Sequence, residues 1–198
     1  MFSASSEKFY DRFTFLYPIV DLFLRSQKRK LFRTINDFAY GQILDVGVGN
    51  GAHFKYYNTH KIIGIDTSQG MLKQARKHLK QNIQLFHMDG EKLSFPNEAF
   101  DYVVISHVIA VVNDPGKLLE EVYRVLKPDG KVLILNHFTS DTWLMYLDKI
   151  FESIAKLLFF KSVFNISNVR NIEKFNLLTE MNAGLSSYFK ILIYEKKV

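Results

Sequence analysis

Along residues 42–137, short apolar runs rich in Val, Ile and Leu alternate with longer segments in which apolar residues recur at helical spacing. The short runs predict strands that are apolar on both faces, at residues 42–46, 61–66, 83–89, 100–108 and 131–137. The longer segments predict helices at residues 68–81 and 114–130. Such an alternation is typical of a parallel sheet covered on both sides. We therefore predict a single α/β domain with a mostly parallel sheet and helices on both faces.

Every predicted strand ends in side chains that can form hydrogen bonds. These residues are Asp45, Asp66, Asp89, Ser106, His107, Asn136 and His137. Burying such groups without partners would cost about 1–3 kcal/mol each. In folds of this kind, ligands bind beyond the carboxyl ends of the strands. The shared position of these groups predicts a binding site at that edge of the sheet.

The first strand runs into a glycine-rich loop, with the sequence ILDVGVGNGAH. Gly47, Gly49 and Ala52 fit the G-x-G-x-x-A pattern of dinucleotide-binding loops, which is a weak signal by itself. Those loops hold a pyrophosphate at a helix N-terminus, whereas Asp45 would place a negative charge in the same space. An acid there suits a cationic ligand and disfavours an NAD-dependent oxidoreductase.

Two further acids extend this pattern. Asp66 lies at the end of the second strand, where its two oxygens could bind a ribose diol, and Asp89 could accept a hydrogen bond from an adenine amine. The ligand that fits these three acids is S-adenosylmethionine, a nucleoside with an amino-acid tail and a sulfonium. One acid precedes the glycines, one would meet the ribose and one would meet the base.

Four segments carry a resemblance to a known family: ILDVGVGNG, IGIDTSQGMLKQAR, MDGEKLSFPNEAFDYVV and EEVYRVLKPDGKVLIL. In order and spacing they resemble the class I S-adenosylmethionine-dependent methyltransferases, which implies a Rossmann-like domain. By this resemblance, the residues that hold the methionyl end of the cofactor are Asp45, Gly47, Gly49 and Gly51. The residues near the nucleoside are Asp66 at the ribose, Met71 by the adenine, and Asp89 and Gly90 at the adenine edge. His107 would lie beside the methyl group.

Only LSSYFKILIYEKKV remains after Gly184, which is barely enough for the two strands that close the sheet in this family. We expect the last strand to be present and its partner strand to be short or absent.

Residues 1–40 precede the predicted cofactor-binding domain of residues 41–198 as an amphipathic, basic extension. The chain has a net charge of +6, and its first 36 residues hold seven basic and three acidic side chains. We expect a short helix, a bend at Tyr17–Pro18 and a second helix that carries the basic run. Aromatic residues beside Lys and Arg are typical of a helix at a membrane surface. Alternatively, the apolar face packs on the sheet domain.

A helical insert is predicted at residues 140–165, after the fifth strand, where apolar residues form one broad stripe. It could line an acyl-chain groove or contact a membrane, or it could simply cover the core.

The acceptor is indicated by a narrower resemblance. The segments FYDRFTFLYPIVD, LDVGVGNG, HVIAVVNDP and LNHF are similar to soluble bacterial phosphatidylethanolamine N-methyltransferases. This implies a phospholipid substrate, and the basic N-terminal segment suggests an anionic membrane surface. Our hypothesis is that Asn136 and His137 meet the headgroup and that Tyr10 and Tyr17 close over it. His137 or Asp141 could accept the amine proton.

Other partners are disfavoured. ISHVIAVVN replaces the Asn/Asp-Pro-Pro-aromatic motif of nucleobase amino-methyltransferases, so nucleic acid is not expected despite the basic charge. The chain has no cysteine and its six histidines are scattered, so no metal is expected. The longest uncharged stretch is too short to span a bilayer, and no signal-peptide pattern is visible. We expect a cytoplasmic monomer associated peripherally with the membrane.

Two alternatives remain open. A methyltransferase for a quinone or another small hydrophobic acceptor would have a similar sheet. A non-catalytic protein could use the same basic, amphipathic ends to bind membranes, although the intact acid and glycine set argues against it.

Overall fold

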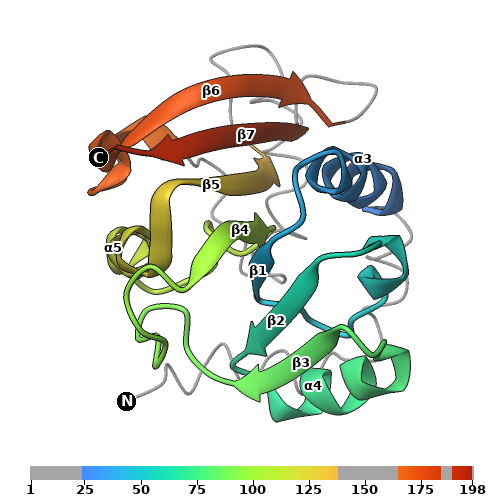
Figure 1. Ribbon diagram of the computed structural model, residues 1–198. Coiled ribbons are helices and arrows are strands. Elements are labelled where there is room, and N and C mark those ends of the chain that lie inside the picture. The colour runs from blue at the N-terminus through green and yellow to red at the C-terminus, as the bar shows by residue number, and fades with distance from the viewer. Residues whose placement is uncertain (1–23, 138–164, 184–188, 198) are drawn as a thin grey trace, which may run out of the picture.

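Seven strands form one sheet in the order β3-β2-β1-β4-β5-β7-β6 (Figure 1). The computed structural model describes residues 24–137, 165–183 and 189–197. The strands are β1 Gln42–Val46, β2 Lys61–Asp66, β3 Ile83–His87, β4 Phe100–Ser106, β5 Leu126–His137, β6 Phe175–Asn182 and β7 Phe189–Lys196. The first five are parallel, and β7 runs antiparallel between β5 and β6.

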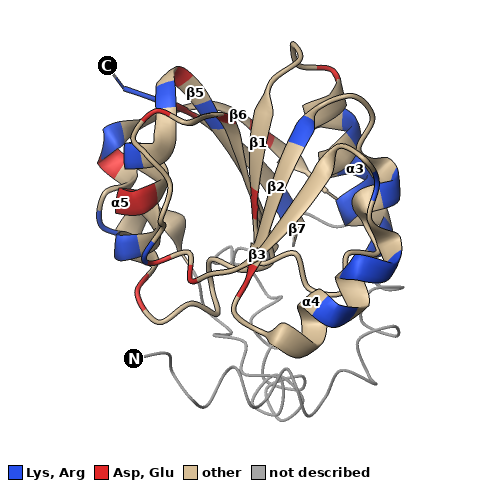
Figure 2. Cartoon of the chain, turned by 60° about the horizontal axis from the view of Figure 1, so that its bottom comes forward, with Lys and Arg blue, Asp and Glu red and all other residues tan. Residues whose placement is uncertain are grey.

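Helices lie on both faces of this sheet, with α5 on one side and α3 and α4 on the other (Figure 2). Their bounds are α3 Arg25–Asn36, α4 Gln69–Ala75 and α5 Pro115–Val125. Ser68 Oγ caps α4 by accepting a hydrogen bond from Met71 N at 3.1 Å. Asp114 caps α5 in the same way, and Pro115 occupies the first helical position. The predicted α/β architecture is confirmed.

Each face of the sheet has its own core. On the α5 side, fully buried residues of the helix such as Leu118 and Val122 pack with Val103 and Ile105 of β4. On the other side, α3 and α4 pack against the alternate residues of the same strands. Because successive strand residues point to opposite faces, strands that are apolar throughout fill both cores.

Two predicted helices end earlier than the sequence pattern indicates. The α5 helix ends at Val125, and β5 begins at Leu126 rather than at Lys131. Pro128 explains this difference, because its ring cannot follow a continuing helix and restricts the residue before it. The α4 helix ends at Ala75 and continues as a 3₁₀ turn over Arg76–His78.

The expectation that the last strand lacks a full partner is wrong. Strands β6 and β7 both have eight residues and form an antiparallel pair. Strand β6 lies at the edge of the sheet, and most of its side chains are exposed, Leu177 and Leu178 among them. An exposed edge strand needs no apolar alternation, which is why the sequence pattern missed it.

The basic run of the N-terminal extension lies on α3, as predicted for the second helix. The apolar face of this helix, Leu31, Phe32 and Ile35, is fully buried against the sheet. Lys30 Nζ donates a hydrogen bond to Asn182 O at 2.6 Å, which joins α3 to the end of β6. The helix and bend expected within residues 1–23 lie outside the described residues. Residues 140–164 of the predicted insert also lie outside them. Among the described helices, none is both long and apolar enough to cross a bilayer.

Candidate functional site

The loop after β1 has a backbone that only glycine adopts easily. Gly47, Gly49 and Gly51 have φ values of +71°, +55° and +72°. A Cβ atom at Gly47 would lie 2.3 Å from Val108 Cγ2, and one at Gly51 would lie 2.7 Å from Phe54 Cε2. The loop is therefore a tight turn at the carboxyl edge of the sheet, packed closely against neighbouring side chains.

Asp66 binds this loop from the end of β2. Its Oδ2 accepts a hydrogen bond from Gly49 N at 2.7 Å, and its Oδ1 accepts one from Ser68 N at 2.8 Å. Burial raises the pKa of Asp66 despite these two hydrogen bonds, which act in the opposite direction. Asp45 therefore precedes the glycine loop, and Asp66, the second acid predicted for the same ligand, bonds the middle of that loop.

Asp45 is 1% exposed at the end of β1. Its Oδ2 lies 2.8 Å from His53 Nε2 and accepts a hydrogen bond from Tyr57 Oη at 3.0 Å. Burial and the charge of Asp45 raise the pKa of Tyr57 well above its ordinary value, so Tyr57 remains a donor. Among the described residues, no Lys or Arg forms an ion pair with Asp45. The one possible cationic neighbour of this buried carboxylate among the described residues is His53, which is charged only when protonated, so the position suits a cationic ligand.

His53 and Tyr57 were not predicted from the sequence. They follow the glycine loop rather than ending a strand, and α3 holds them in place. The Phe32 ring stacks on His53 with centroids 4.8 Å apart and meets the Tyr57 ring edge-on at 4.7 Å. The only sequence signal was a run of aromatic residues, HFKYY, immediately after the loop.

The residues predicted near the nucleoside follow β2 and β3. Asp89 Oδ1 accepts a hydrogen bond from Glu91 N at 2.9 Å and so shapes the turn after β3. Gly90 leaves little space for a side chain, because a Cβ would lie 3.0 Å from both Leu118 Cδ1 and Val46 Cγ1. Met71 is buried in the first turn of α4.

The ends of β4 and β5 lie side by side, with Ser106 paired to Leu135. His107 has a φ of +60°, and its ring meets the Phe189 ring edge-on with centroids 5.6 Å apart. Asn136 is fully buried. Ser106 Oγ, one of the polar groups predicted at this edge, is buried and has no hydrogen-bond partner within the described part of the chain.

Four predicted acceptor-site residues are described incompletely or not at all. Only the backbone of His137 is described, opposite Phe189 of β7. Tyr10, Tyr17 and Asp141 lie outside the described residues. Across residues 24–137, 165–183 and 189–197, no group of three or more His, Asp or Glu side chains is arranged to hold a metal ion.

Comparison with known proteins decides the family. Residues 44–134 match the model of a methyltransferase domain family. A phosphatidylethanolamine N-methyltransferase of Cereibacter sphaeroides is 30% identical over 165 residues, covering 79% of this chain and 81% of that protein. The chain belongs to the class I S-adenosylmethionine-dependent methyltransferases. Its methyl donor is S-adenosylmethionine, as predicted.

Other relatives of this methyltransferase act on a different acceptor. A demethylmenaquinone methyltransferase of Lactobacillus johnsonii is 35% identical over 147 residues, covering 66% of this chain and 60% of that protein. A solved structure of an S-adenosylmethionine-dependent methyltransferase from Thermotoga maritima superposes with a TM-score of 0.74, covering 96% of this chain and 99% of that one. At 21% identity, that likeness concerns the fold.

The residues of this methyltransferase fit the cofactor. The glycine loop carries no side chains at Gly47, Gly49 and Gly51, where φ is left-handed, so its backbone can approach a ligand closely. Asp45 supplies a buried negative charge for a cation, and Asp66 supplies carboxylate oxygens at the adjacent strand end. This set of groups complements an ammonium, a sulfonium and a ribose.

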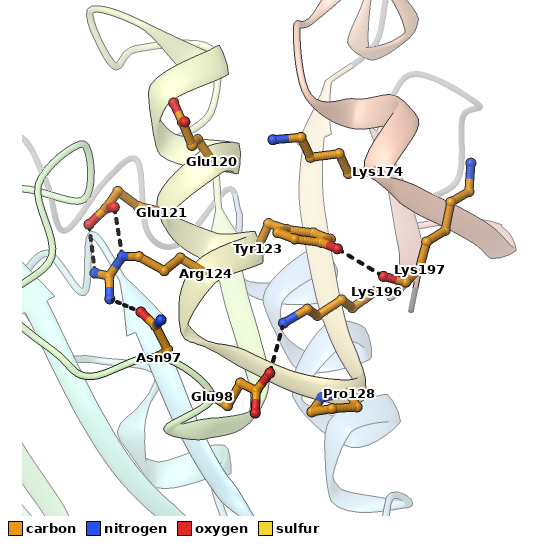
Figure 3. Close-up of a pocket in the computed structure, with 10 residues that line it drawn as sticks. All are labelled: Asn97, Glu98, Glu120, Glu121, Tyr123, Arg124, Pro128, Lys174, Lys196 and Lys197. Carbon is orange, nitrogen blue, oxygen red and sulfur yellow. Dashed lines mark hydrogen bonds and ion pairs between the residues drawn. The ribbon is translucent and has the colours of Figure 1, made fainter.

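A hollow of this methyltransferase lies at the opposite edge of the sheet, between α5 and the end of β7 (Figure 3). Tyr123 stands at its centre, with Lys196 Nζ 4.7 Å and Lys174 Nζ 5.4 Å from the ring centroid. Tyr123 Oη donates a hydrogen bond to Lys197 O at 3.1 Å, and Lys196 Nζ lies 3.9 Å from Glu98. These contacts fasten the end of β7 to α5.

Proposed function

We propose that this methyltransferase transfers the methyl group of S-adenosylmethionine to the headgroup amine of phosphatidylethanolamine, giving methylated derivatives towards phosphatidylcholine. The observation that carries the proposal is the likeness to the Cereibacter sphaeroides enzyme, which covers 79% of this chain and 81% of that protein. That coverage extends well beyond residues 44–134, which methyltransferases of many specificities share.

In this proposal, the cofactor binds at the carboxyl ends of β1, β2 and β3. The groups for its methionyl end are Asp45, Gly47, Gly49 and Gly51. The groups for its nucleoside are Asp66 at the ribose, Met71 by the adenine, and Asp89 and Gly90 at the adenine edge. Support comes from the bond between Gly49 N and Asp66 Oδ2, which brings the loop and the ribose acid together.

The acceptor approaches from the ends of β4 and β5, where His107 lies beside the methyl group and Asn136 and His137 meet the lipid headgroup. When bound, S-adenosylmethionine supplies a sulfonium methyl that an amine displaces, so that a C–N bond forms as the C–S bond breaks. The chain's main task is to align the amine, and positioning of this kind can lower a barrier by about 7–11 kcal/mol.

The amine must also lose a proton, because a primary amine has a pKa of about 10.4, like that of Lys. His137 or Asp141 accepts this proton, directly or through water. Tyr10 and Tyr17 close over the headgroup and hold the bulkier cation that each transfer produces by cation–π attraction.

Membrane association follows from the charge of α3 in this proposal. Arg25, Arg29 and Arg33 are exposed on this helix, and Lys and Arg positions recur along the ribbons of α3 and α4 (Figure 2). A basic surface attracts anionic lipids by about 1 kcal/mol for each basic residue close to the membrane. The protein would act while bound peripherally to an anionic membrane surface, with one of these basic residues at the lipid phosphate.

A second candidate is methylation of a quinone, because demethylmenaquinone methyltransferases are among the relatives of this chain. It predicts label transfer to a demethylated naphthoquinol and none to phosphatidylethanolamine. The Lactobacillus johnsonii relative shares less of its length with this chain than the lipid enzyme does, 60% against 81%.

The test uses methyl-labelled S-adenosylmethionine and vesicles of phosphatidylethanolamine, with and without an anionic lipid, followed by separation of the lipids. Vesicles of phosphatidylcholine alone, which have no primary amine, are the matched control. Labelled mono-, di- or trimethylated lipid supports the proposal and shows how far the series runs. Vesicles that bind the protein but gain no label would refute the lipid acceptor.

A further inference from the structure

We propose that His53 and Tyr57 are positioning residues that orient the Asp45 carboxylate towards the ammonium group of the cofactor's amino-acid tail. We call Asp45, His53 and Tyr57 the Asp45 clamp. The clamp acts on the methyl donor, so its role is the same whichever acceptor is methylated.

Both clamp donors converge on one oxygen of the carboxylate. His53 Nε2 lies 2.8 Å and Tyr57 Oη 3.0 Å from Asp45 Oδ2. Asp45 Oδ1 accepts no hydrogen bond from any described residue. The carboxylate cannot rotate without losing both bonds, each of which is strengthened by its negative charge. The clamp therefore leaves Oδ1 as the acceptor for an approaching cation.

The donors are held by packing as well as by hydrogen bonds. His53 is 5% exposed, and its ring lies between Phe32, stacked at an interplanar angle of 11°, and Phe54, edge-on at 69°. Tyr57 is fully buried, and its ring also meets Phe32. Neither donor can swing away from Asp45 without displacing the buried face of α3.

The clamp closes the glycine loop at its base. Asp45 lies two residues before Gly47, and His53 lies two residues after Gly51, so the bond between them joins the two ends of the loop. The loop and the fixed carboxylate therefore present their polar groups together. The nucleoside part of the cofactor depends instead on Asp66, which lies on β2.

Because the clamp serves the amino-acid tail and Asp66 serves the nucleoside, binding of different ligands can distinguish a positioning role of the clamp from a purely structural one. If the clamp orients Asp45 for the ammonium, its loss weakens ligands that carry an amino-acid tail and spares ligands that lack one. If the clamp only maintains the loop, its loss weakens both kinds of ligand alike.

The experiment measures dissociation constants by titration calorimetry for S-adenosylhomocysteine, which carries the ammonium, and 5′-methylthioadenosine, which lacks the amino-acid tail. The variants are Tyr57→Phe, His53→Leu and His53→Gln. We expect Tyr57→Phe and His53→Leu each to weaken S-adenosylhomocysteine binding about tenfold, as loss of one hydrogen bond to a charged group does. Binding of 5′-methylthioadenosine should change less than about twofold, since the bonds that are lost do not serve the nucleoside. His53→Gln should restore most of the affinity, because its amide N–H can replace the imidazole N–H.

Tyr123→Phe is the matched control, because it also removes one phenol hydroxyl that bonds a neighbour, but at the opposite edge of the sheet. It should leave both constants unchanged. Equal weakening of the two ligands by Tyr57→Phe, or no weakening of either, would overturn the proposal. Tyr57→Phe keeps the ring that packs on Phe32, so the test holds even if His53→Leu fails to fold. No acceptor is present, so the result is independent of the phospholipid proposal.

Discussion

Asp66 Oδ2 accepts a hydrogen bond from Gly49 N at 2.7 Å, which joins the end of β2 to the middle of the glycine loop. The same carboxylate also holds Ser68 N, the backbone of the residue that caps α4. One acid thereby fixes the loop and the start of the adjacent helix, the two backbone segments that frame the proposed cofactor site.

The raised pKa of Asp66 predicts a distinct pH dependence of stability. A carboxyl group whose pKa is higher in the folded than in the unfolded chain opposes folding once it ionises. The free energy of unfolding should therefore fall, relative to Asp66→Asn, as the pH rises from about 3.9, the pKa of an ordinary aspartate, through the raised pKa. Urea denaturation across this range measures it. Parallel stability curves for the two proteins would contradict the assignment.

Gly47→Ala should weaken cofactor binding. The added Cβ would lie 2.3 Å from Val108 Cγ2, and φ of +71° is strained for alanine. We expect S-adenosylhomocysteine affinity to fall by about tenfold or more, since a clash and strain together cost upwards of 1.4 kcal/mol. Gly90→Ala, whose nearest contacts are 3.0 Å, should have a smaller effect by calorimetry. The reverse order would show that the loop backbone is not critical.

Much of the fold could be predicted because the buried parallel strands carry their own signal. The bounds expected for β1 and β2 coincide with the observed strands, since each has a short core of buried apolar residues with polar or charged residues near its ends. Strand β6 could not be found in this way, because its side chains are largely exposed at the sheet edge. Burial, and not strand formation, produces the pattern that sequence reasoning detects.

The site was predictable to a similar extent. Asp45 and Asp66 could be placed because strand ends in a parallel sheet share one edge. His53 and Tyr57 could not, because their role depends on contacts with Asp45 and Phe32, and Phe32 lies on a helix that precedes the sheet. Hydrogen bonds between side chains of different elements leave no periodic trace in a sequence.

The left-handed backbone of His107 predicts that a glycine variant is more stable than an alanine variant at this position. A left-handed φ of +60° is strained for any residue with a Cβ, and glycine relieves that strain. We therefore expect His107→Gly to be more stable than His107→Ala by about 1 kcal/mol, the reverse of the usual preference. Chemical denaturation of both variants measures this difference. An alanine variant that equals or exceeds the glycine variant in stability would contradict it.

Reversing one charge on α3 should weaken membrane binding. Arg29 is exposed on the basic face, so Arg29→Glu should reduce binding to anionic vesicles by about thirtyfold at low salt, since the reversal changes two charges and each charge near the surface contributes about 1 kcal/mol. Lys117→Glu, an equally exposed reversal on α5 across the sheet, is the control for net charge. Vesicle co-sedimentation compares the two. Equal losses would mean that no particular face meets the membrane.

The most direct test of the proposed acceptor is a competition in one set of vesicles. Vesicles containing equal amounts of phosphatidylethanolamine and a demethylated menaquinol are incubated with methyl-labelled S-adenosylmethionine, and the label in each product is counted. The account predicts that label accumulates in methylated phosphatidylethanolamine and that Gly47→Ala reduces this labelling. Label confined to the quinol would contradict the phospholipid proposal and establish the other acceptor.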